Sequence, residues 1–343
     1  IDYLQRSFCM RDRRSTYDIT DDVQLTDADS VLQAVCTVFR NAFTQFNENA
    51  LKQAFHDCER LFEGDYSTYL PCDTLYHDKQ HSMDMTLALA RLINGHERSV
   101  ARDERLGADR AVIAIITALY HDSGYIRHEN DHCHFNGAEY TPIHVSRSAD
   151  FLKRYLHKIK LGEYAQLAAN MVHYTGYEIA PAHIRLPDEK WHTIGQMLGT
   201  ADLIAQMSDR CYLEKCRDRL YPEFVLGGMT VKLDETGNET VIYESGEDLL
   251  RKTPHFYEND VEHRLNQLFN KVYSYEIAHF EGENHYIKGL GKNQARLKAV
   301  LAADDFSMLR RLPPENYGTR HFPGLETYLN KHPLKKLSSY KLD

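Results

Sequence analysis

Residues 108–124 read ADRAVIAIITALYHDSG, and this stretch decides the fold. We predict a helix over 108–121 that is apolar on nearly every side, so other elements should surround it. Two strongly polar residues, His121 and Asp122, close this helix, and Gly124 follows as a helix terminator. Uncompensated burial of polar groups costs on the order of 2–7 kcal/mol. A bound metal would satisfy the two side chains, and a hydrogen-bonded pair at the helix end is the alternative.

Helical periodicity dominates the rest of the chain. Apolar residues recur at helical spacing in seven further stretches, which we predict as helices: 29–45, 83–93, 146–158, 164–173, 188–216, 258–279 and 291–303. The segment MTVKLDETGNETVIY at 229–243 predicts a β-hairpin with Gly237 in its turn. The sequence therefore predicts an all-α domain over residues 25–305 with a small β-hairpin insertion. Residues 1–24 and 306–343 are expected to be loosely packed tails.

Composition and charge limit the classes of function. The chain has 343 residues, of which 42% are hydrophobic and 27% charged, as in globular proteins. Its net charge of −9 argues against nucleic acid as a partner, and an anionic substrate would need a local positive centre such as a metal. The seven cysteines are scattered and form no CxxC pair, which favours a reducing compartment. Without a membrane-spanning run or a signal-peptide pattern, we expect a cytoplasmic protein with no membrane partner.

The segment YHDKQHSMDM at 76–85 places His77 and His81 four residues apart. On a helix these two histidines share one face, and Asp84 extends it. One histidine can then bind a metal while the other projects about 5–6 Å away. Asp84 is placed to accept a hydrogen bond from the ring of His81, as a second-shell partner of a metal ligand. The alternative is a solvated polar face.

Three more candidate ligands follow. His144 begins an amphipathic helix in AEYTPIHVSRSADFL, with Arg147 one turn later. His173 follows an apolar stretch in ANMVHYTGYE, just before a break that contains glycine. Asp202 lies in GTADLIAQMSDR, on a helix that is otherwise apolar on that side, where an unpaired carboxylate is costly.

In chain order the candidate ligands are a His, a His-Asp pair, two more His and a distant Asp: His81, His121, Asp122, His144, His173 and Asp202. This ordered series resembles the HD-domain metal-dependent phosphohydrolase superfamily in its binuclear form. The gaps of 40, 22, 29 and 29 residues between successive elements are similar to those of that form. Tyr76, His77 and His81 also look like the YHNxxH motif of the cyclic-nucleotide phosphodiesterases. The resemblance covers roughly residues 70–210.

The resemblance implies an HD-domain helical bundle that holds two divalent metal ions. The first metal would be bound by His81, His121, Asp122 and Asp202. Asp122 would bridge to a second metal, held by His144 and His173. The reaction implied is hydrolysis of a phosphodiester or phosphomonoester of a nucleotide-type substrate by a metal-bridging hydroxide, with His77 as general acid. Imidazole and carboxylate ligands suit Fe, Mn, Zn, Co or Ni, with Mg a further option at the second site.

Some features depart from the phosphodiesterase pattern and leave the substrate open. Tyr125 stands where the phosphodiesterases carry His, and the GYP motif of the cyclic-di-GMP enzymes is absent after His173. Arg147 is the candidate for steering the phosphate group, and an ordinary surface arginine is the alternative. The His-rich segment 128–137 is either a second metal site or, more economically, a lid over the site.

Two other functions remain open. Some HD-domain proteins, such as myo-inositol oxygenase, have a similar ligand set but activate oxygen at a di-iron centre. A metal-containing module that binds a nucleotide without catalysis is the other alternative. His77 as a proton donor favours hydrolysis, so the expected partner is a small-molecule phosphate ester. A homodimer and an upstream regulatory domain stay open, the latter because the chain opens on Ile1.

Overall fold

The computed structural model describes residues 14–233 and 238–315. Within these residues the chain is built from α-helices and one two-stranded antiparallel sheet. The elements in chain order are α1 (Ala28–Ala42), α2 (Glu48–Glu63), α3 (Lys79–Ser99), α4 (Ala108–Leu119), α5 (His144–Lys158), α6 (Ala165–Met171), α7 (Glu189–Ser208), α8 (Tyr212–Lys215), α9 (Tyr221–Leu226), β1 (Val231–Leu233), β2 (Glu239–Val241), α10 (Gly246–Phe256), α11 (Tyr275–His279) and α12 (His285–Ala303).

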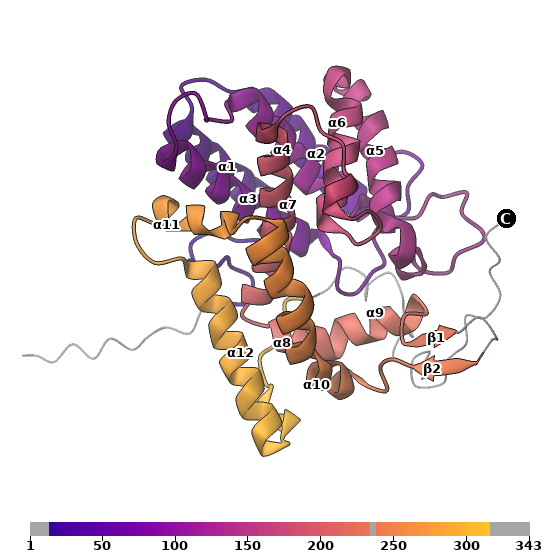
Figure 1. The fold of residues 1–343 in the computed structure, drawn as a ribbon. Helices are drawn as coiled ribbons and strands as arrows, with labels where there is room; N and C mark the ends of the chain where they lie inside the picture. Colours follow the sequence, from indigo (N-terminus) through magenta and orange to yellow (C-terminus); the bar gives the residue numbers. More distant parts are fainter. Residues whose placement is uncertain (1–13, 234–237, 316–343) are drawn as a thin grey trace, which may run out of the picture.

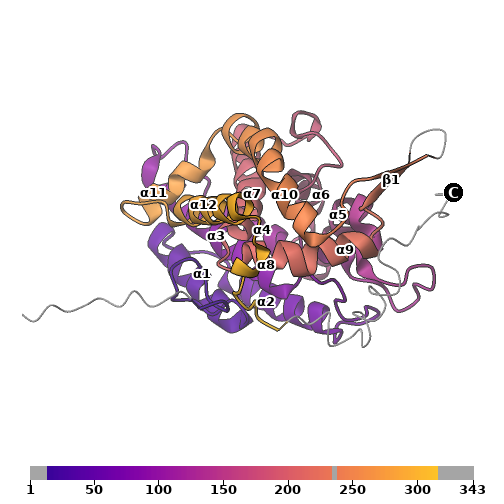
Figure 2. The same ribbon diagram turned by 90° about the horizontal axis from the view of Figure 1, so that it is seen from below.

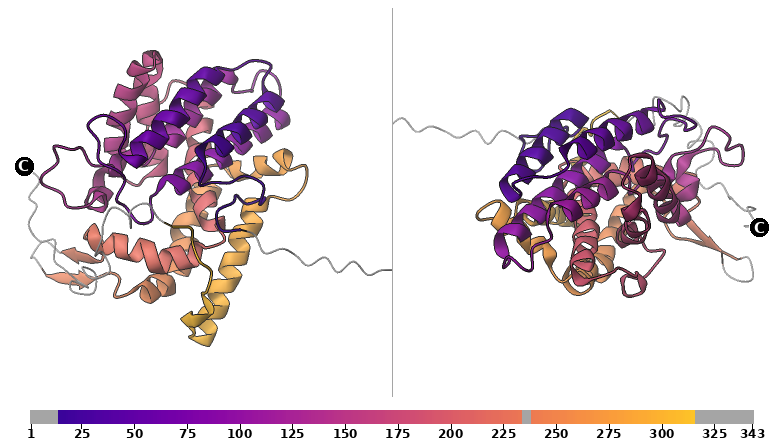
Figure 3. Two further views of the ribbon diagram at one scale, coloured as in Figure 1. Left: turned by 180° about the vertical axis from the view of Figure 1, so that it is seen from behind. Right: turned by 90° about the horizontal axis from the view of Figure 1, so that it is seen from above.

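The apolar helix that the sequence singled out lies at the centre of the fold. Every residue of α4 from Ala111 to Leu119 is buried, because α2, α3, α6 and α7 pack around it. Helix α3 also packs against α1, α7 and α11. The α1 and α2 helices cover the side of the molecule that faces away from the viewer in Figure 1, as Figure 3 shows from behind. The predicted all-α fold with a small hairpin is confirmed.

The C-terminal elements form a second region beside this bundle. In Figure 1, α8, α9, α10 and the hairpin lie below α1–α7, and α12 runs down along them from α11. Figure 2 shows from below that the hairpin projects outward beyond α9. Its strands pair Val231 with Val241 and Leu233 with Glu239. The predicted turn residue Gly237 lies outside the described residues. No helix of the described residues is long and apolar enough to cross a membrane.

Helix α3 begins later than the HxxxH pattern predicts. Asp78 is its N-cap, and the Asp78 carboxylate accepts a hydrogen bond from the backbone N–H of His81. His77 therefore lies before the helix, and the predicted helical face shared by His77, His81 and Asp84 is wrong for His77. The rings of His77 and His81 are nevertheless close, with centroids 6.0 Å apart.

Two predicted helices are interrupted. The helix expected over 188–216 ends at Ser208, where the Asp209 side chain accepts a hydrogen bond from the backbone N–H of Cys211 and favours a turn. The helix expected over 258–279 is broken into π-helical and 3₁₀ turns before α11. In these segments the hydrophobic period of 3.6 does not hold, because a π-helical turn contains an extra residue.

Parts of both predicted tails are packed against the domain. Asp18 is buried and forms an ion pair with Arg91 of α3 at 2.5 Å. Phe306 and Leu309 are buried, and Arg217 donates hydrogen bonds to the backbone carbonyls of both residues. The prediction of loose tails is therefore wrong for residues 14–24 and 306–315, because buried ion pairs and apolar side chains hold these segments.

Candidate metal centre

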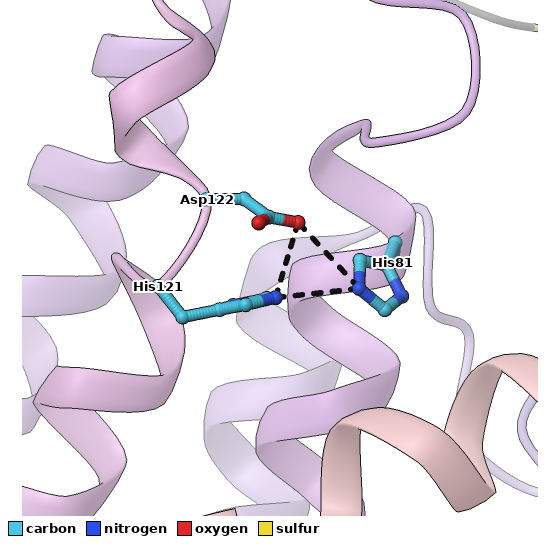
Figure 4. A group of neighbouring side chains, drawn as sticks. All are labelled: His81, His121 and Asp122. Atoms are coloured by element: carbon cyan, nitrogen blue, oxygen red, sulfur yellow. Dashed lines mark hydrogen bonds and ion pairs between the residues drawn. The ribbon is translucent and has the colours of Figure 1, made fainter. Parts of the chain in front are cut away.

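Three of the six predicted ligands, His81, His121 and Asp122, meet at one buried point between α3 and the end of α4, and Asp202 of α7 lies beside it. Nε2 of His81 lies 3.3 Å from Nε2 of His121 and 3.5 Å from Oδ2 of Asp122. It lies 3.1 Å from Oδ1 of Asp202. Nε2 of His121 is 3.1 Å from Oδ2 of Asp122 and 3.8 Å from Oδ1 of Asp202. Figure 4 shows three of these side chains, His81, His121 and Asp122, pointing toward one another.

The hydrogen bonds of His121 fix which atoms face this point. Nδ1 of His121 lies 2.8 Å from the carbonyl oxygen of Ala118, so Nδ1 is the nitrogen that carries a proton and donates. Nε2 therefore faces Oδ2 of Asp122, which is buried and 3.1 Å away. A ring nitrogen and a carboxylate oxygen this close need a positive charge between them, which a bound metal ion would supply.

In the absence of a cation, protons would take its place. Burial by itself lowers the pKa of His121, but the Asp122 carboxylate outweighs burial and raises this pKa to about 9. Burial would raise the pKa of Asp122, yet the charges of His121 and His77 hold it far below the usual range. A metal at this point therefore has to displace a proton, and its affinity should fall as the pH falls.

His144 lies on the other side of Asp122. It is the first residue of α5, and its Nδ1 donates a hydrogen bond to the carbonyl oxygen of Thr141 at 2.7 Å. Its Nε2 faces Oδ1 of Asp122 at 3.9 Å, whereas the other carboxylate oxygen faces His81 and His121. This arrangement suits a carboxylate that bridges two ions.

Gly124 permits this approach of α5. The residue does not terminate the helix, because α4 already ends at Leu119 and Gly124 lies in the following 3₁₀ turn. A Cβ at Gly124 would stand 1.8 Å from the backbone oxygen of His144. A glycine is therefore required for the start of α5 to pack on the His-Asp turn.

His173, the remaining predicted ligand, makes no hydrogen bond or ion pair with the cluster in the part of the chain that the structure describes. His173 is buried in the 3₁₀ turn Val172–Thr175, and its Nδ1 has no hydrogen-bond partner. Over residues 14–233 and 238–315, no hydrogen bond or ion pair connects His173 to Asp122 or His144. Asp84 lies on α3 one turn after His81. Both roles, metal ligand for His173 and orienting partner for Asp84, stay predictions.

His77 is held by a residue that the sequence did not reveal. Glu223 of α9 is fully buried, pairs with Nδ1 of His77, and accepts hydrogen bonds from the backbone N–H groups of Tyr76 and His77. Burial alone would lower the pKa of His77, but Glu223, Asp122 and Asp202 raise it to about 9. His77 is therefore a protonated imidazolium at neutral pH in the metal-free protein.

A sequence signal for Glu223 exists in hindsight. The residue is a lone carboxylate beside Phe224, Val225 and Leu226, and burial of such a group is costly unless it is paired. The same argument selected Asp202. Gln206, one turn after Asp202, was also missed: its amide donates to Asp202 at 3.3 Å and its oxygen accepts from Tyr76 at 3.1 Å.

Tyr125 joins the two histidines at the mouth of the cluster. Its buried ring stacks on His77 with centroids 4.6 Å apart and on His144 with centroids 4.4 Å apart. The interplanar angles are 17° and 18°. Tyr125 therefore fixes the orientation of both imidazole rings, in the position where the phosphodiesterases carry His.

Arg147 does not face the cluster. Its guanidinium donates to the carbonyl oxygens of Gly124 and Ile126 and lies 3.4 Å from the ring centre of Tyr140. These contacts use two of the five guanidinium N–H groups, and Arg147 does not line the adjoining cavity. Arg147 thus holds the segment that follows the His-Asp pair, and its role in steering phosphate stays a prediction.

The His-rich segment 128–137 forms a local network of its own. Asp131 accepts hydrogen bonds from His134 at 3.0 Å and from Tyr140 at 2.5 Å, and His128 packs edge-on against Tyr69. In the part of the chain that the structure describes, the His, Cys and acidic side chains grouped closely enough to hold a metal are His81, His121 and Asp122. The segment lines neither the cluster nor the cavity, which argues against both a second metal site and a lid in this structure.

A cavity of about 450 Å³ opens directly on the cluster. His77, Asp122, Tyr125, His144 and Asp202 line its polar end. Three of the predicted ligands and the predicted proton donor thus lie at the wall of a space that is large enough for a small molecule.

The fold and the cluster together define an all-α protein with a buried His/Asp centre that could hold a metal ion. A family model described as Npun_R2479-like matches residues 65–275, more than half of the chain, so the protein belongs to the Npun_R2479-like family. The matched region contains every residue that lines the cavity. Searches of curated proteins and of solved structures gave no match.

Proposed function

We propose that the protein is a metal-dependent phosphohydrolase of the HD-domain type. The observation that carries the proposal is the cluster itself: the imidazoles of His81 and His121 lie 3.1–3.8 Å from carboxylate oxygens of Asp122 and Asp202, and both carboxylates line a cavity beside His77. Such mixed nitrogen and oxygen ligands suit a first-row transition metal. Asp122 and His144 support a second divalent ion on the far side of the carboxylate.

The chain's own residues would divide the work. A divalent metal bound by His81, His121, Asp122 and Asp202 would neutralise the phosphoryl oxygens and lower the pKa of water for attack on phosphorus. His77 would donate a proton to the departing oxygen of the ester. Glu223 would hold the His77 ring and keep it protonated, and Tyr125 would fix its plane.

Charge makes the metal a condition for substrate binding. The described walls of the cavity carry three carboxylates, Asp122, Glu178 and Asp202, against one ammonium group, Lys252, and the His77 imidazolium, whose charge is paired with Glu223. An anionic ester would be repelled from this wall unless a cation offset the carboxylates. We therefore expect phosphate esters to bind the metal-loaded protein and to leave the metal-free protein unbound.

The test combines metal analysis of the protein with hydrolysis assays on a panel of phosphate esters. The protein, purified with and without oxygen, should contain bound transition metal, and the metal-loaded protein should release phosphate or alcohol from phosphate mono- or diesters under both conditions. His77→Ala should keep its metal and lose about 10²–10⁴ in turnover. His132→Ala, which changes an exposed histidine outside the cluster, is the matched control.

Two outcomes would overturn the proposal. A metal-loaded protein that hydrolyses no ester of the panel, nucleotides included, would remove the hydrolase function. Activity that vanishes without oxygen would support an oxygenase in its place. Loss of metal in His77→Ala would make His77 a ligand and end its role as proton donor.

A further inference from the structure

The cavity beyond the cluster is apolar, and its walls come from the C-terminal region. Glu178 and Lys252 are the only charged side chains among its described lining residues apart from the cluster's carboxylates and histidines. The apolar walls come from α7, α8, α9, α10 and the segments between them: Leu203, Met207, Tyr212, Leu220, Phe224, Met229, Tyr243, Leu249 and Phe256. A substrate that reaches the metal centre must place its organic part against these side chains.

A second cavity lies next to the first. It has a volume of about 330 Å³ and lies between α10 and α12. Met207, Tyr212 and Thr253 line both cavities, so the two cavities share a wall at these three side chains, which we call the junction. Leu213, Leu290, Leu297 and Leu301 give the second cavity an apolar surface, and Glu258, Asn293, Gln294 and Lys298 supply its polar lining.

The walls of the first cavity offer too few positive charges for a polyphosphate. Lys252 is the only Lys or Arg among the described lining residues of the first cavity, and its ammonium group is already engaged. It donates hydrogen bonds to the carbonyl oxygen of Ile242 at 2.6 Å and to Asp248 at 2.8 Å. Recognition of a polyphosphate would need several uncommitted Lys or Arg side chains, or a bidentate arginine.

We propose that the substrate is a phosphate ester of an elongated, uncharged apolar chain, with its phosphate at the cluster and its chain in the two cavities. Burial of an alkyl chain against these walls would supply most of the binding free energy of the organic part. The phosphate would depend on the metal centre for its recognition. This inference rests on the proposed phosphohydrolase function for the nature of the head group.

Non-hydrolysable alkylphosphonates test the chain without requiring turnover. Ethyl-, hexyl- and decylphosphonate, each below its micelle concentration, are titrated calorimetrically into the full-length metal-loaded protein. We expect the affinity to rise by about two- to fourfold for each added methylene, as for transfer of alkyl groups out of water. Equal affinity for the three compounds would overturn the inference.

The junction between the cavities supplies the decisive variant. Thr253→Phe should leave ethylphosphonate binding unchanged and remove most of the gain from hexyl to decyl, because the larger ring blocks the second cavity. Thr193→Phe is the matched control: the Thr193 hydroxyl also bonds a carbonyl one turn back, and Thr193 lines neither cavity. An unchanged decyl affinity in Thr253→Phe would place the chain elsewhere.

A second variant covers the case in which Thr253→Phe does not fold. Phe256 lines the first cavity and is 38% exposed, so Phe256→Glu should fold and should weaken decylphosphonate at least about tenfold more than ethylphosphonate. Chain-length dependence without hydrolysis of any ester would keep this inference and overturn the proposed function. Hydrolysis without chain-length dependence, with nucleoside phosphates preferred, would do the reverse.

Discussion

The candidate metal centre and the apolar cavity are built by different kinds of structure. His81 and Asp202 lie on the long, regular helices α3 and α7, and His121 and Asp122 lie in the turn after α4. Most of the apolar cavity wall comes from short helices, a π-helical turn and residues flanking the hairpin between 212 and 256, together with Leu203 and Met207 of α7. The ligands of a metal are restricted to a few residue types in a fixed order, whereas many apolar side chains can line a cavity. The sequence therefore indicates candidate metal ligands, but it does not indicate which residues line the cavity.

The two regions meet at His77. Its ring faces the cluster from one side, and on the other side it is held by Glu223, which is 146 residues further along the chain. The π-helical turn Cys216–Leu220 immediately precedes α9, which carries Glu223. Such turns are frequent at functional sites because they rotate the side chains that follow. The C-terminal region thus positions His77, the proposed proton donor, and supplies most of the apolar cavity wall.

Removal of the shared carboxylate should have the largest effect. Asp122→Ala takes away the group that faces His81 and His121 with one oxygen and His144 with the other. We expect the bound metal to fall below one tenth of the wild-type content. Turnover should fall by more than about 10³-fold, because changes to outer-shell partners alone cost 10–100-fold. Elemental analysis and ester hydrolysis are the measurements.

The control for Asp122→Ala is His132→Ala, which should retain metal and activity. Circular dichroism should show helical content equal to that of the wild type in both variants. If Asp122→Ala kept its full metal content, the carboxylate would not bridge and the cluster would not be the metal centre.

Substitution of Glu223, which pairs with Nδ1 of His77, should lower turnover less than Asp122→Ala does and should leave the metal bound. Glu223→Gln removes the charge that raises the pKa of His77, and metal should remain bound because Glu223 does not face the cluster. We expect turnover at pH 7 to fall by about 10–100-fold. A general acid acts when protonated, so the alkaline limb of the kcat profile should shift to lower pH in the variant.

Glu223→Asp, which keeps the charge on a shorter side chain, should shift this limb less than Glu223→Gln. An unchanged pH profile in Glu223→Gln would mean that Glu223 supports the fold only. Loss of metal in this variant would contradict the separation between the two regions.

The cluster could be predicted from the sequence more fully than the C-terminal region. The proximity of His81, His121 and Asp122 was predictable, because polar side chains beside an apolar helix must be satisfied, and Asp202 lies 3.1 Å from His81. The contacts of Arg147 were not predictable, because spacing does not show that two of its N–H groups donate to backbone carbonyls. Glu223 and the cavity walls depend on tertiary contacts and on π-helical turns, which periodicity cannot reveal.

Substitution of Gly124 tests whether the packing of α5 on the His-Asp turn is needed for stability and for metal binding. A Cβ at this position would also lie 2.7 Å from the carbonyl carbon of His144, so Gly124→Ala should push the start of α5 away. We expect a loss of about 1–3 kcal/mol in the free energy of unfolding, as for overpacking. Metal bound by the other four ligands should remain. Chemical denaturation and metal analysis measure the two effects.

A glycine in open space provides the control for Gly124→Ala. Gly291 lies on α12, where an added Cβ would have no neighbouring atom within 4 Å, so Gly291→Ala should stabilise the protein by about 0.5–1 kcal/mol. Equal changes of the same sign in the two variants would show that the approach of α5 to the His-Asp turn is not restrictive.

The smallest effect is expected for substitution of His279 in α11, which packs on α3. His279, the last residue of α11, has a pKa lowered to about 4 by burial and by the charges of Arg91, Arg98 and His285. The unfolded chain, with a histidine pKa near about 6.5, binds this proton more readily, so stability is lost as the pH falls from about 6.5 toward 4. His279→Gln cannot bind the proton. The stability difference between wild type and variant should therefore shrink by on the order of 1 kcal/mol between pH 7 and pH 5, a value reduced for the partial exposure of the ring. Urea unfolding of both proteins at each pH measures this difference, and a constant difference would mean that the packing of α11 on α3 does not depend on a neutral His279.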